Sequence, residues 1–309
     1  MIFGQSHRYR IDQKMIIIRL LGGLGNQLFQ YALGRKLAYK HNSDLKLDIS
    51  GFAHSSSRIE TPRSYRLNLF NIKASIARTE EIQKLRGWEL DRIPLISPLL
   101  LRLCHPPSTY IRERSQRFDP HILGLTNNIY LDGYWQSEDY FIDIRDLLLK
   151  EITRKDVSYD DNRGYLEQIT SSSSISIHIR RGDYATDLKT NRYHGVCSLE
   201  YYRKAVEHMT EREDEPHFFI FSDDLKWARE NLTFIQDAEY ISHNEKDSEH
   251  LDLWLMSQCK HQIIANSSFS WWGAWLNQNN EKIVIAPKQW LLDDQINTDD
   301  IIPKSWTKI

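Results

Sequence analysis

The sequence is poor in cysteine and lacks any long hydrophobic run. Its 309 residues include three cysteines, Cys104, Cys197 and Cys259, which are far apart and show no metal-ligand spacing. No stretch approaches the roughly 18 apolar residues that a bilayer-spanning helix needs, and residues 1–14 have no apolar run typical of a signal peptide. We therefore expect buried thiols in a reducing compartment and a cytoplasmic protein.

A surplus of charge is also missing, which argues against nucleic acid as a partner. The 40 Lys and Arg residues nearly balance 42 Asp and Glu residues, and the formal net charge is −2. Such a chain has no overall basic field to attract a phosphate backbone. Aromatic residues are plentiful instead, with 9 Trp and 15 Tyr. Rings of this kind more often fill a core than line sugar or base sites.

The hydrophobic patterns predict an α/β protein. The β-branched run 16–20 predicts a buried strand, a helical period follows its glycine loop, and 45–49 predicts a second strand, which together make a βαβ unit. The second half alternates strands at 175–179, 217–222, 238–241, 262–265 and 282–286 with helices at 198–213, 224–231, 247–260 and 268–278. This alternation indicates a doubly wound parallel sheet.

The chain is expected to form two such halves. The serine run 171–174 has little tendency to pack, and we interpret it as the joint between residues 15–170 and 171–309. Met15 opens the first strand and has the features of a natural start, so residues 1–14 are expected to be an extension. Residues 51–128 show no clear pattern.

Three polar segments directly follow predicted strands of the second half. They are HIRRGDY (178–184), SDD (222–224) and NSSFSWW (266–272). In parallel sheets the loops at the carboxyl ends of the strands gather at one edge, and ligands bind there. We therefore expect these three segments to meet in one site.

The first segment places two arginines at a strand end. Arginine stays protonated and is costly to bury without an anion. His178 and Arg180 share one face of the strand, whereas Arg181 points to the other. We expect Arg180 to face an anionic ligand and Arg181 to pair with a structural carboxylate such as Asp183. His178 is either a satisfied core histidine or a ligand contact.

The serine-rich segment also has two interpretations. Asn266, Ser267 or Ser268 can cap the helix that follows. The same helix N-terminus can bind an anion. Because two arginines come from a neighbouring strand end, the combination favours a phosphate or diphosphate over a carboxylate.

The acidic segment allows three roles. Asp223 and Asp224 follow Ser222 at a strand end, where a carboxylate can accept the paired N–H donors of guanine. One of the two can instead begin the next helix. A Mg²⁺ role is weaker, because neighbouring side chains diverge on an extended segment.

A glycine loop, GGLGNQ, follows the first strand. It is not the dinucleotide fingerprint, because Leu28 stands where the third glycine is required, and it is not a P-loop, because no Gly-Lys-Ser/Thr follows. What remains is a flexible loop whose backbone can approach a ligand. Asn26 and Gln27 offer amide groups that suit sugar hydroxyls.

Together these motifs resemble the bacterial α-1,2-fucosyltransferases of glycosyltransferase family 11. The matching segments run in order from Met15 and are GGLGNQLFQYA (22–32), DGYWQSEDYF (132–141), HIRRGDY (178–184), FSDD (221–224) and LMSQCKHQIIANSSFSWWGAWL (255–276). The resemblance implies a GT-B-type fold, in which two Rossmann-like domains face each other across a cleft. Residues 15–170 would be the acceptor side, and 171–309 would bind GDP-fucose.

The resemblance also implies a reaction and its residues. Such enzymes transfer L-fucose from GDP-β-L-fucose to O2 of a terminal β-galactoside, with inversion and without a metal ion or other cofactor. Arg180 would contact the diphosphate and Asp224 the guanine. The implied donor-binding set is His178, Arg180, Ser222, Asp223, Asp224, Asn266, Ser267, Ser268 and Phe269. The implied acceptor-binding set is Asn26, Gln27 and Trp135.

In this scheme, catalysis rests on charge stabilisation. Arg180 and the helix N-terminus at Asn266 would stabilise the charge that grows on the leaving diphosphate, with Asn26 beside the reacting sugars. The sequence does not identify the general base. Asp183, Glu138 and Asp139 are candidates because they lie close to the motifs.

Other functions and partners stay open. The alternatives are a GDP-sugar transferase of another linkage, a non-catalytic nucleotide- or glycan-binding protein, and a glycoside hydrolase. The resemblance suggests surface polysaccharide (O-antigen) synthesis on a lipid-linked glycan, and a homo-oligomer is an open alternative. The apolar run 93–104 and the arginines Arg112, Arg114 and Arg117 either contact an anionic membrane surface or form a core helix and a solvated loop.

Overall fold

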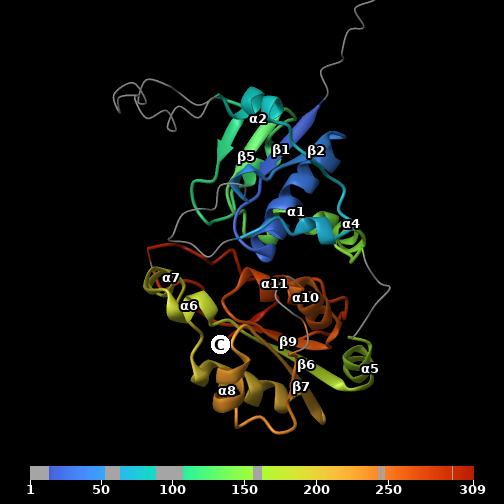
Figure 1. The fold of residues 1–309 in the computed structure, drawn as a ribbon, viewed down its shortest axis with the longest axis vertical. Helices are drawn as coiled ribbons and strands as arrows, with labels where there is room; N and C mark the ends of the chain where they lie inside the picture. Colours follow the sequence, from blue (N-terminus) through green and yellow to red (C-terminus); the bar gives the residue numbers. More distant parts are fainter. Residues whose placement is uncertain are drawn as a thin grey trace, which may run out of the picture.

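Two parallel β-sheets, each covered by helices, make up the protein (Figure 1). The computed structural model describes residues 14–52, 63–87, 107–155, 162–242, 244, 248–293 and 295–309. The predicted architecture of two Rossmann-like α/β domains is confirmed.

The first sheet has the strand order β3-β2-β1-β5-β4. Its strands are β1 (Met15–Arg19), β2 (Asp44–Asp48), β3 (Ser75–Ile76), β4 (Tyr110–Arg112) and β5 (Ile129–Asp132). Its helices are α1 (Leu24–His41), α2 (Thr79–Arg86) and α4 (Arg145–Glu151). Alternate residues of β1 serve opposite faces, because Ile16 and Ile18 join the core under α1 whereas Ile17 packs with Leu85 of α2. The sheet is therefore buried on both sides.

The second sheet has the order β11-β10-β9-β6-β7-β8. Its strands are β6 (Ser173–Ile179), β7 (Pro216–Ser222), β8 (Glu239–Tyr240), β9 (His261–Ile263), β10 (Val284–Ala286) and β11 (Thr307–Lys308). Its helices are α5 (Arg163–Ser171), α6 (Gly182–Thr186), α7 (Leu188–His194), α8 (Leu199–Thr210), α9 (Leu225–Asn231), α10 (Glu249–Gln258) and α11 (Ser268–Trp275). The central β6 lies between β9 and β7 and ends directly before Arg180.

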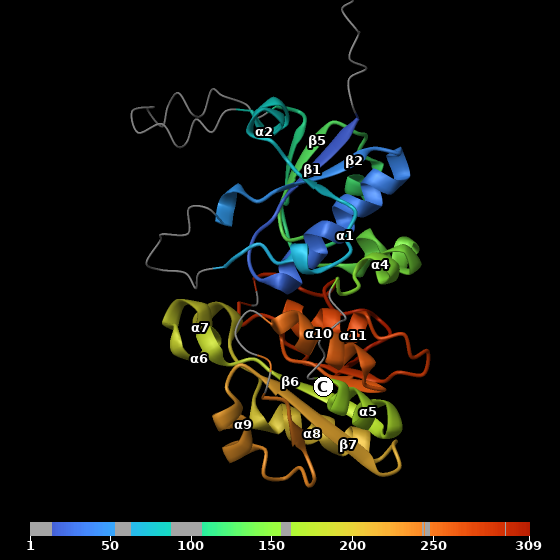
Figure 2. The ribbon, with the colours of Figure 1, turned by 45° about the vertical axis from the view of Figure 1, so that its right-hand side comes forward.

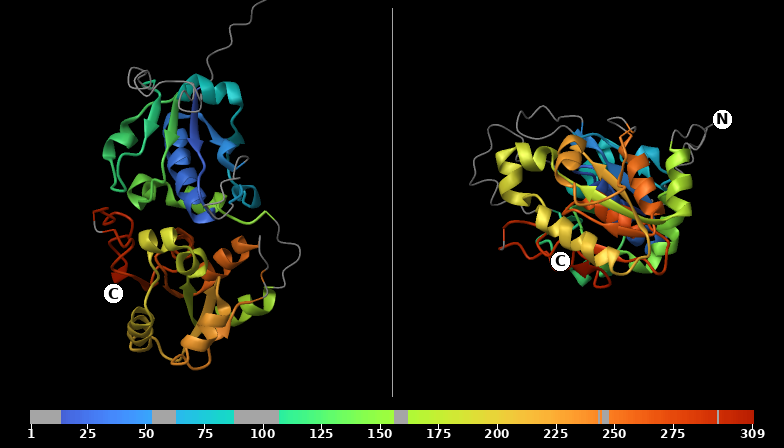
Figure 3. Two further views of the ribbon diagram at one scale, coloured as in Figure 1. Left: turned by 60° about the vertical axis from the view of Figure 1, so that its left-hand side comes forward. Right: turned by 90° about the horizontal axis from the view of Figure 1, so that it is seen from below.

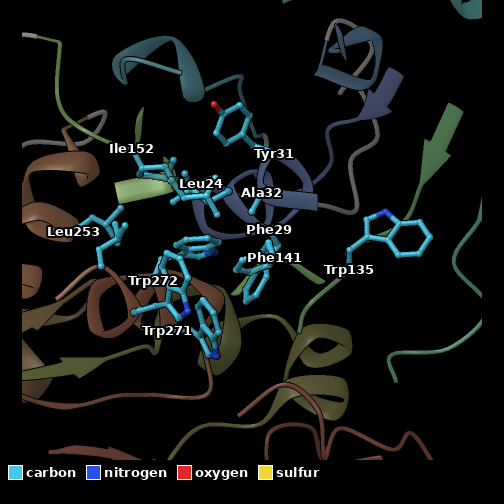
Figure 4. Close-up of a cluster of buried hydrophobic side chains, with 14 of the residues drawn as sticks. Leu24, Phe29, Tyr31, Ala32, Trp135, Phe141, Ile152, Leu253, Trp271 and Trp272 are labelled. Atoms are coloured by element: carbon cyan, nitrogen blue, oxygen red, sulfur yellow. The ribbon is translucent and has the colours of Figure 1, made fainter. Parts of the chain in front are cut away.

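An aromatic cluster joins the two domains. Helix α1 packs on α11, and Figures 1 and 2 both show α1 and α4 facing α10 and α11. Phe29 of α1 lies 4.4 Å from Trp271 and 5.2 Å from Trp272, measured between ring centroids. Phe141 stacks on Trp272 at 5.6 Å (Figure 4). All four rings are fully buried, so one hydrophobic core runs through both domains.

The serine run is not the joint between the domains. Ser171 is the last residue of α5, and Ser173 and Ser174 are the first residues of β6. Helix α5 itself packs against α10 and β6, so this stretch belongs to the second domain. The hydroxyls of the serine run bind α5 carbonyls or cap neighbouring groups, which explains how a polar run fits at the start of a buried strand.

Several other predictions concern features that the structure only partly describes. The apolar run 93–104, which includes Cys104, and residues 1–13 of the extension lie outside the described residues. Cys259 is buried, whereas Cys197 is half-buried. In the part of the chain that is described, no helix is long and apolar enough to cross a membrane.

Candidate active site

The three polar segments of the second domain meet, as the sequence predicts. Ile179 pairs with Ser222 across β6 and β7, so the residues after both strands begin at the same height of the sheet. The Arg180 Nη1 atom lies 2.7 Å from the Asp223 Oδ2 atom. From the third segment, the Phe269 ring lies 5.4 Å from the His178 ring. The carboxyl edge of the sheet therefore carries one polar site.

Arg180 is held between two carboxylates. Its Nη2 atom donates to Asp183 Oδ1 at 2.5 Å, and its Nη1 atom contacts Asp223. Its guanidinium carbon also lies 5.2 Å from the centre of the Tyr184 ring. These contacts fix the plane of the guanidinium, whose remaining N–H groups can bind an anion.

The pairing expected for Arg181 is wrong. Its Nε atom lies 3.4 Å from Asp224, and its guanidinium carbon lies 4.0 Å from the centre of the Trp227 ring. Asp183 pairs with Arg180 instead. The reason is that the strand ends at Ile179 and α6 begins at Gly182, so the two-residue alternation of a strand no longer applies at Arg181.

Asp224 caps the helix after β7, which is one of its predicted roles. Its Oδ1 atom accepts a hydrogen bond from the Trp227 amide at 3.1 Å. Asp223 accepts one from the Arg181 amide at 2.8 Å. A Cβ atom on Gly182 would lie 2.5 Å from Asp223 Oδ2, so a larger residue there would displace the Asp223 carboxylate. Both carboxylates thus organise the loop after β6, and the guanine contact of Asp224 stays a prediction.

In the serine turn at the start of α11, Asn266 and Ser267 are held by hydrogen bonds within the protein, whereas Ser268 is available to a ligand. The Asn266 amide group donates to the carbonyls of His194 and Trp290 at 2.8 and 3.3 Å, and Asn266 is buried. It ties loops together and has no free donor for a phosphate. Ser267 caps α11 by accepting from the Phe269 amide. Within the described residues the Ser268 hydroxyl makes no hydrogen bond, which leaves it available to a ligand.

The glycine loop of the first domain lies directly on this turn. A Cβ atom on Gly25 would sit 2.4–2.6 Å from the backbone of Ser268 and Phe269. Only glycine allows this approach. It brings the N-terminus of α1, which starts at Leu24, against the N-terminus of α11. Both ends carry partial positive charge, so their meeting point favours an anion.

Arg63 is a site residue that the sequence did not reveal. Its Nη2 atom donates to Asp183 Oδ2 at 2.8 Å, and its Nη1 atom would lie 3.9 Å from a Cβ atom on Gly23. It therefore reaches from the first domain to Arg180, Asp183 and Asp223 of the second, which we call the arginine cluster. No sequence motif marks it, because it lies within residues 51–128, which show no clear pattern.

Gln27 does not face an acceptor, contrary to its predicted role. It is fully buried, and its Nε2 atom donates to the carbonyls of Gly22 and Ser64 at 3.0 and 2.8 Å. Its Oε1 atom accepts from the Arg66 amide at 2.9 Å. These three bonds hold the glycine loop against residues 64–66, and so they place Arg63. Asn26 is half-buried and accepts from Gln136 Nε2 at 2.8 Å, so it stays an acceptor candidate.

Trp135 is buried rather than presented to solvent. Its φ angle is 58°, in the left-handed region that bulky residues rarely adopt. Two bonds to Glu113 hold this conformation: the amides of Tyr134 and Trp135 donate to the Glu113 carboxylate at 2.7 and 2.9 Å. Trp135 lies apart from Trp271 and Trp272 (Figure 4) and lines a cavity of about 620 Å³.

The three candidate general bases lie in different parts of the structure. Glu138 accepts from Trp275 Nε1 at 3.1 Å, near the C-terminal end of α11. With a rise of 1.5 Å per residue, that end lies about 10 Å from the serine turn. Burial raises the pKa of Glu138, and its place in the domain interface gives it a structural role. Asp183 lies in the arginine cluster, whereas Asp139 is exposed and its contact with a sugar stays a prediction.

Two histidines near the cluster are neutral. Burial, with Arg180 nearby, lowers the pKa of His178 to about 3, and burial lowers the pKa of His194 to about 4. The Nδ1 atom of each lacks a hydrogen-bond partner among the described residues. His194 stacks on Tyr184 with 4.4 Å between ring centroids. The sequence singled out His178 but missed His194, since a histidine at a short helix end has no distinguishing pattern.

In the described ranges no three His, Cys, Asp or Glu side chains lie close enough together to hold a metal ion. The expectation that no metal is required is not tested by this observation. The positive groups of the site are the arginines and the two helix ends.

The known proteins to which this chain is similar are glycosyltransferases. The model of "Glycosyl transferase family 11" matches residues 107–309. An Escherichia coli alpha-1,2-colitosyltransferase is 33% identical over 96% of this chain and 99% of its own length. The Escherichia coli O-antigen biosynthesis glycosyltransferase WbnK is 35% identical over 94% of this chain and 99% of its own length.

Solved structures share the fold. A mutant of Arabidopsis thaliana FUT1 in complex with GDP superposes with a TM-score of 0.53 and 11% identity, covering 96% of this chain and 76% of that one. The GT-B-type arrangement predicted from the motifs is thereby confirmed.

Proposed function

This chain belongs to glycosyltransferase family 11, and we propose that it transfers L-fucose from GDP-β-L-fucose to O2 of a terminal β-galactoside. The transfer inverts the anomeric centre and needs no metal ion. We further propose a cytoplasmic enzyme of O-antigen synthesis, because one relative carries that role in its name.

One observation carries the proposal. The N-termini of α1 and α11 meet through Gly25, and the arginine cluster lies at the end of the neighbouring β6. A diphosphate suits this place, because two helix ends and two arginines supply positive charge from both domains. The glycine loop then brings the first domain within atomic contact of the donor turn.

The residues act mainly through electrostatics. Breaking the bond between fucose C1 and the β-phosphate leaves growing negative charge on the phosphate oxygens. Arg180 is already fixed by Asp183 and Asp223, so it can stabilise this charge without reorganising. Arg63 adds a second cation from the acceptor side. Asp183, which links both arginines, is the candidate base that lies in the cluster.

A related donor sugar is the second candidate. The colitosyltransferase relative covers nearly the whole chain, and colitose is a sugar related to fucose. The GDP-binding motifs would serve a GDP-linked form of either sugar equally well. A panel of GDP-sugars, with linkage analysis of the product, separates the two.

The first test is GDP release from GDP-fucose in the presence of EDTA, with and without lactose. We expect release that depends on lactose and continues in EDTA. Binding of GDP without transfer from any GDP-sugar to any galactoside would favour a non-catalytic binding protein. A complete lack of GDP binding would contradict the assignment of Arg180 and the serine turn.

A further inference from the structure

A cavity of about 620 Å³ lies at the carboxyl edge of the first sheet, at the ends of β4 and β5. Its walls come from residues 110–122 and from Trp135 and Tyr140. The sequence motifs predicted Trp135 as an acceptor contact, but they did not predict a cavity, since most of its lining lies in the stretch without a clear pattern.

The inner wall is fixed by many contacts. Glu113 holds Trp135 in its left-handed conformation through two backbone amides. The Tyr140 ring packs edge-on against Trp135 at 5.9 Å, and the Asp119 amide donates to the Tyr140 hydroxyl at 2.9 Å. A costly backbone conformation is kept only where its surroundings determine it, and such positions gather at ligand sites.

The cavity adjoins the donor site. Gln116, on the cavity segment, donates to the Tyr193 hydroxyl of α7 at 2.9 Å. From Tyr193 a continuous series of ring contacts passes through His194 and Tyr184 to the Arg180 guanidinium, with separations of 4.8, 4.4 and 5.2 Å. The inner wall also leads to the glycine loop, because Gln136 follows Trp135 and binds Asn26.

The second domain contacts the segment that lines the cavity. Its segment before the C-terminus, red in Figure 3, approaches the first domain there. Asp300 accepts from the Phe118 amide at 2.9 Å and lies 3.6 Å from Arg117. All the residues that line the cavity belong to the first domain, and the contacts of Asp300 place the cavity beside the second domain, as an acceptor site next to a donor domain must be.

The lining charge is unbalanced toward positive. The Glu113 carboxylate accepts hydrogen bonds from two backbone amides, and Asp119 caps the short helix that begins at Pro120. Arg117 pairs with Asp300. Arg112 and Arg114 are exposed, and neither has a carboxylate partner in the described part of the chain. Both arginines line the cavity, where they lie two residues apart along the chain.

We propose that this cavity binds the acceptor glycan beyond its terminal galactose, and that Arg112 and Arg114 bind an anionic group on that glycan. The inference rests on the proposed function and adds the substrate class. A phosphate of a diphosphate linkage and a uronate carboxylate share the required chemistry, since arginine binds both through paired N–H groups. The buried rings of Trp135 and Tyr140 form the inner wall of the cavity and fix its shape.

The test compares three acceptors with one terminal β-galactose. One is neutral, one carries an alkyl diphosphate on the following sugar, and one has a uronic acid there. We expect at least one anionic acceptor to have a KM about 10-fold or more below that of the neutral one. The double variant Arg112→Gln/Arg114→Gln should remove this advantage and leave kcat and the neutral acceptor unchanged. The expected difference in KM follows from the strength of charge-assisted hydrogen bonds, which contribute about 1.5–3 kcal/mol each.

Two further measurements make the result decisive. Arg163→Gln, at an exposed arginine of α5 whose one ion-pair partner among the described residues is Glu167, is the matched control and should change nothing. Calorimetry measures binding of the anionic glycan in the presence of GDP, independently of turnover. This binding should be lost in the double variant but kept in the control. Retained GDP affinity shows that the variant is folded.

The outcomes separate the two proposals. Failure of transfer to all three acceptors, with anionic glycan still bound through the two arginines, overturns the proposed function and supports this site. Equal KM values for neutral and anionic acceptors would contradict the proposed anion site and leave the proposed function unchanged. Loss of binding to anionic vesicles in the double variant, without any change in KM, also overturns it and favours a membrane contact.

Discussion

At the level of single residues, the geometry around Arg180 depends on groups from several chain segments. Asp183 comes from the helix after the strand, Asp223 from the next strand end, and Arg63 from the other domain. Lysine has no planar fork, so it cannot hold two carboxylates and a diphosphate in one plane. The shape of the group matters here as much as its charge.

The variants Arg180→Ala and Arg180→Lys test this. We expect both to lose about 10²–10³ in kcat, since the charge on the leaving phosphate loses its fixed donor. Arg163→Ala serves as the control at an exposed site. Initial rates of GDP release measure the effect, with GDP affinity by calorimetry alongside. If Arg180→Lys retained more than half of the activity, charge alone would explain the role of Arg180.

Single residues also mark where sequence reasoning succeeds and where it ends. Arg180, Asp223 and the serine turn were predictable, because strand ends of a parallel sheet converge whatever the loops contain. The partner of Arg181 was not, since it depends on where the strand stops. Gln27 looked suited to a sugar, but an amide with two donors and an acceptor suits buried backbone groups equally well.

At the level of elements, the contact between α1 and α11 determines the site. The helix predicted at 268–278 is α11, and the strand predicted at 175–179 is β6 with two more residues at its start. Periodicity predicted both elements. It could not predict that Gly25 touches the Ser268 backbone, because packing between two domains leaves no local pattern in either segment.

Gly25→Ala tests the importance of this contact. The added methyl group would overlap backbone atoms at 2.4–2.6 Å, so the two helix ends must move apart. Overpacking of this kind costs about 1–3 kcal/mol, and GDP affinity should fall as the anion site widens. Thermal unfolding and calorimetry measure the two effects.

Gly164→Ala is the matched control for that variant. Gly164 is also the second residue of its helix, and a Cβ atom there would meet nothing within 4 Å. Alanine favours a helix by up to about 1 kcal/mol over glycine, so the control should be neutral or slightly stabilising. Equal Tm values for Gly25→Ala and Gly164→Ala would show that the contact between the domains accommodates the added methyl group at little cost in stability.

At the level of the whole molecule, the two domains share one hydrophobic core. The aromatic cluster of Phe29, Phe141, Trp271 and Trp272 is buried between them. At the far end of α11, Arg145 from the first domain donates to the carbonyls of Trp275 and Asn277 at 2.9 Å each. Separating the domains would expose both groups of contacts to water, so the fold predicts that the domains unfold together.

Phe29→Ala tests this cooperativity. Removing a fully buried phenylalanine typically costs about 3–5 kcal/mol, and here the loss falls on contacts with Trp271 and Trp272 of the other domain. The unmodified protein should show one denaturant transition, with tryptophan fluorescence and far-UV circular dichroism coinciding. The variant should unfold earlier, and its two signals should separate, because each domain keeps its own sheet but loses the shared core. Two separated transitions already present in the unmodified protein would show that the domains are energetically independent despite their contact.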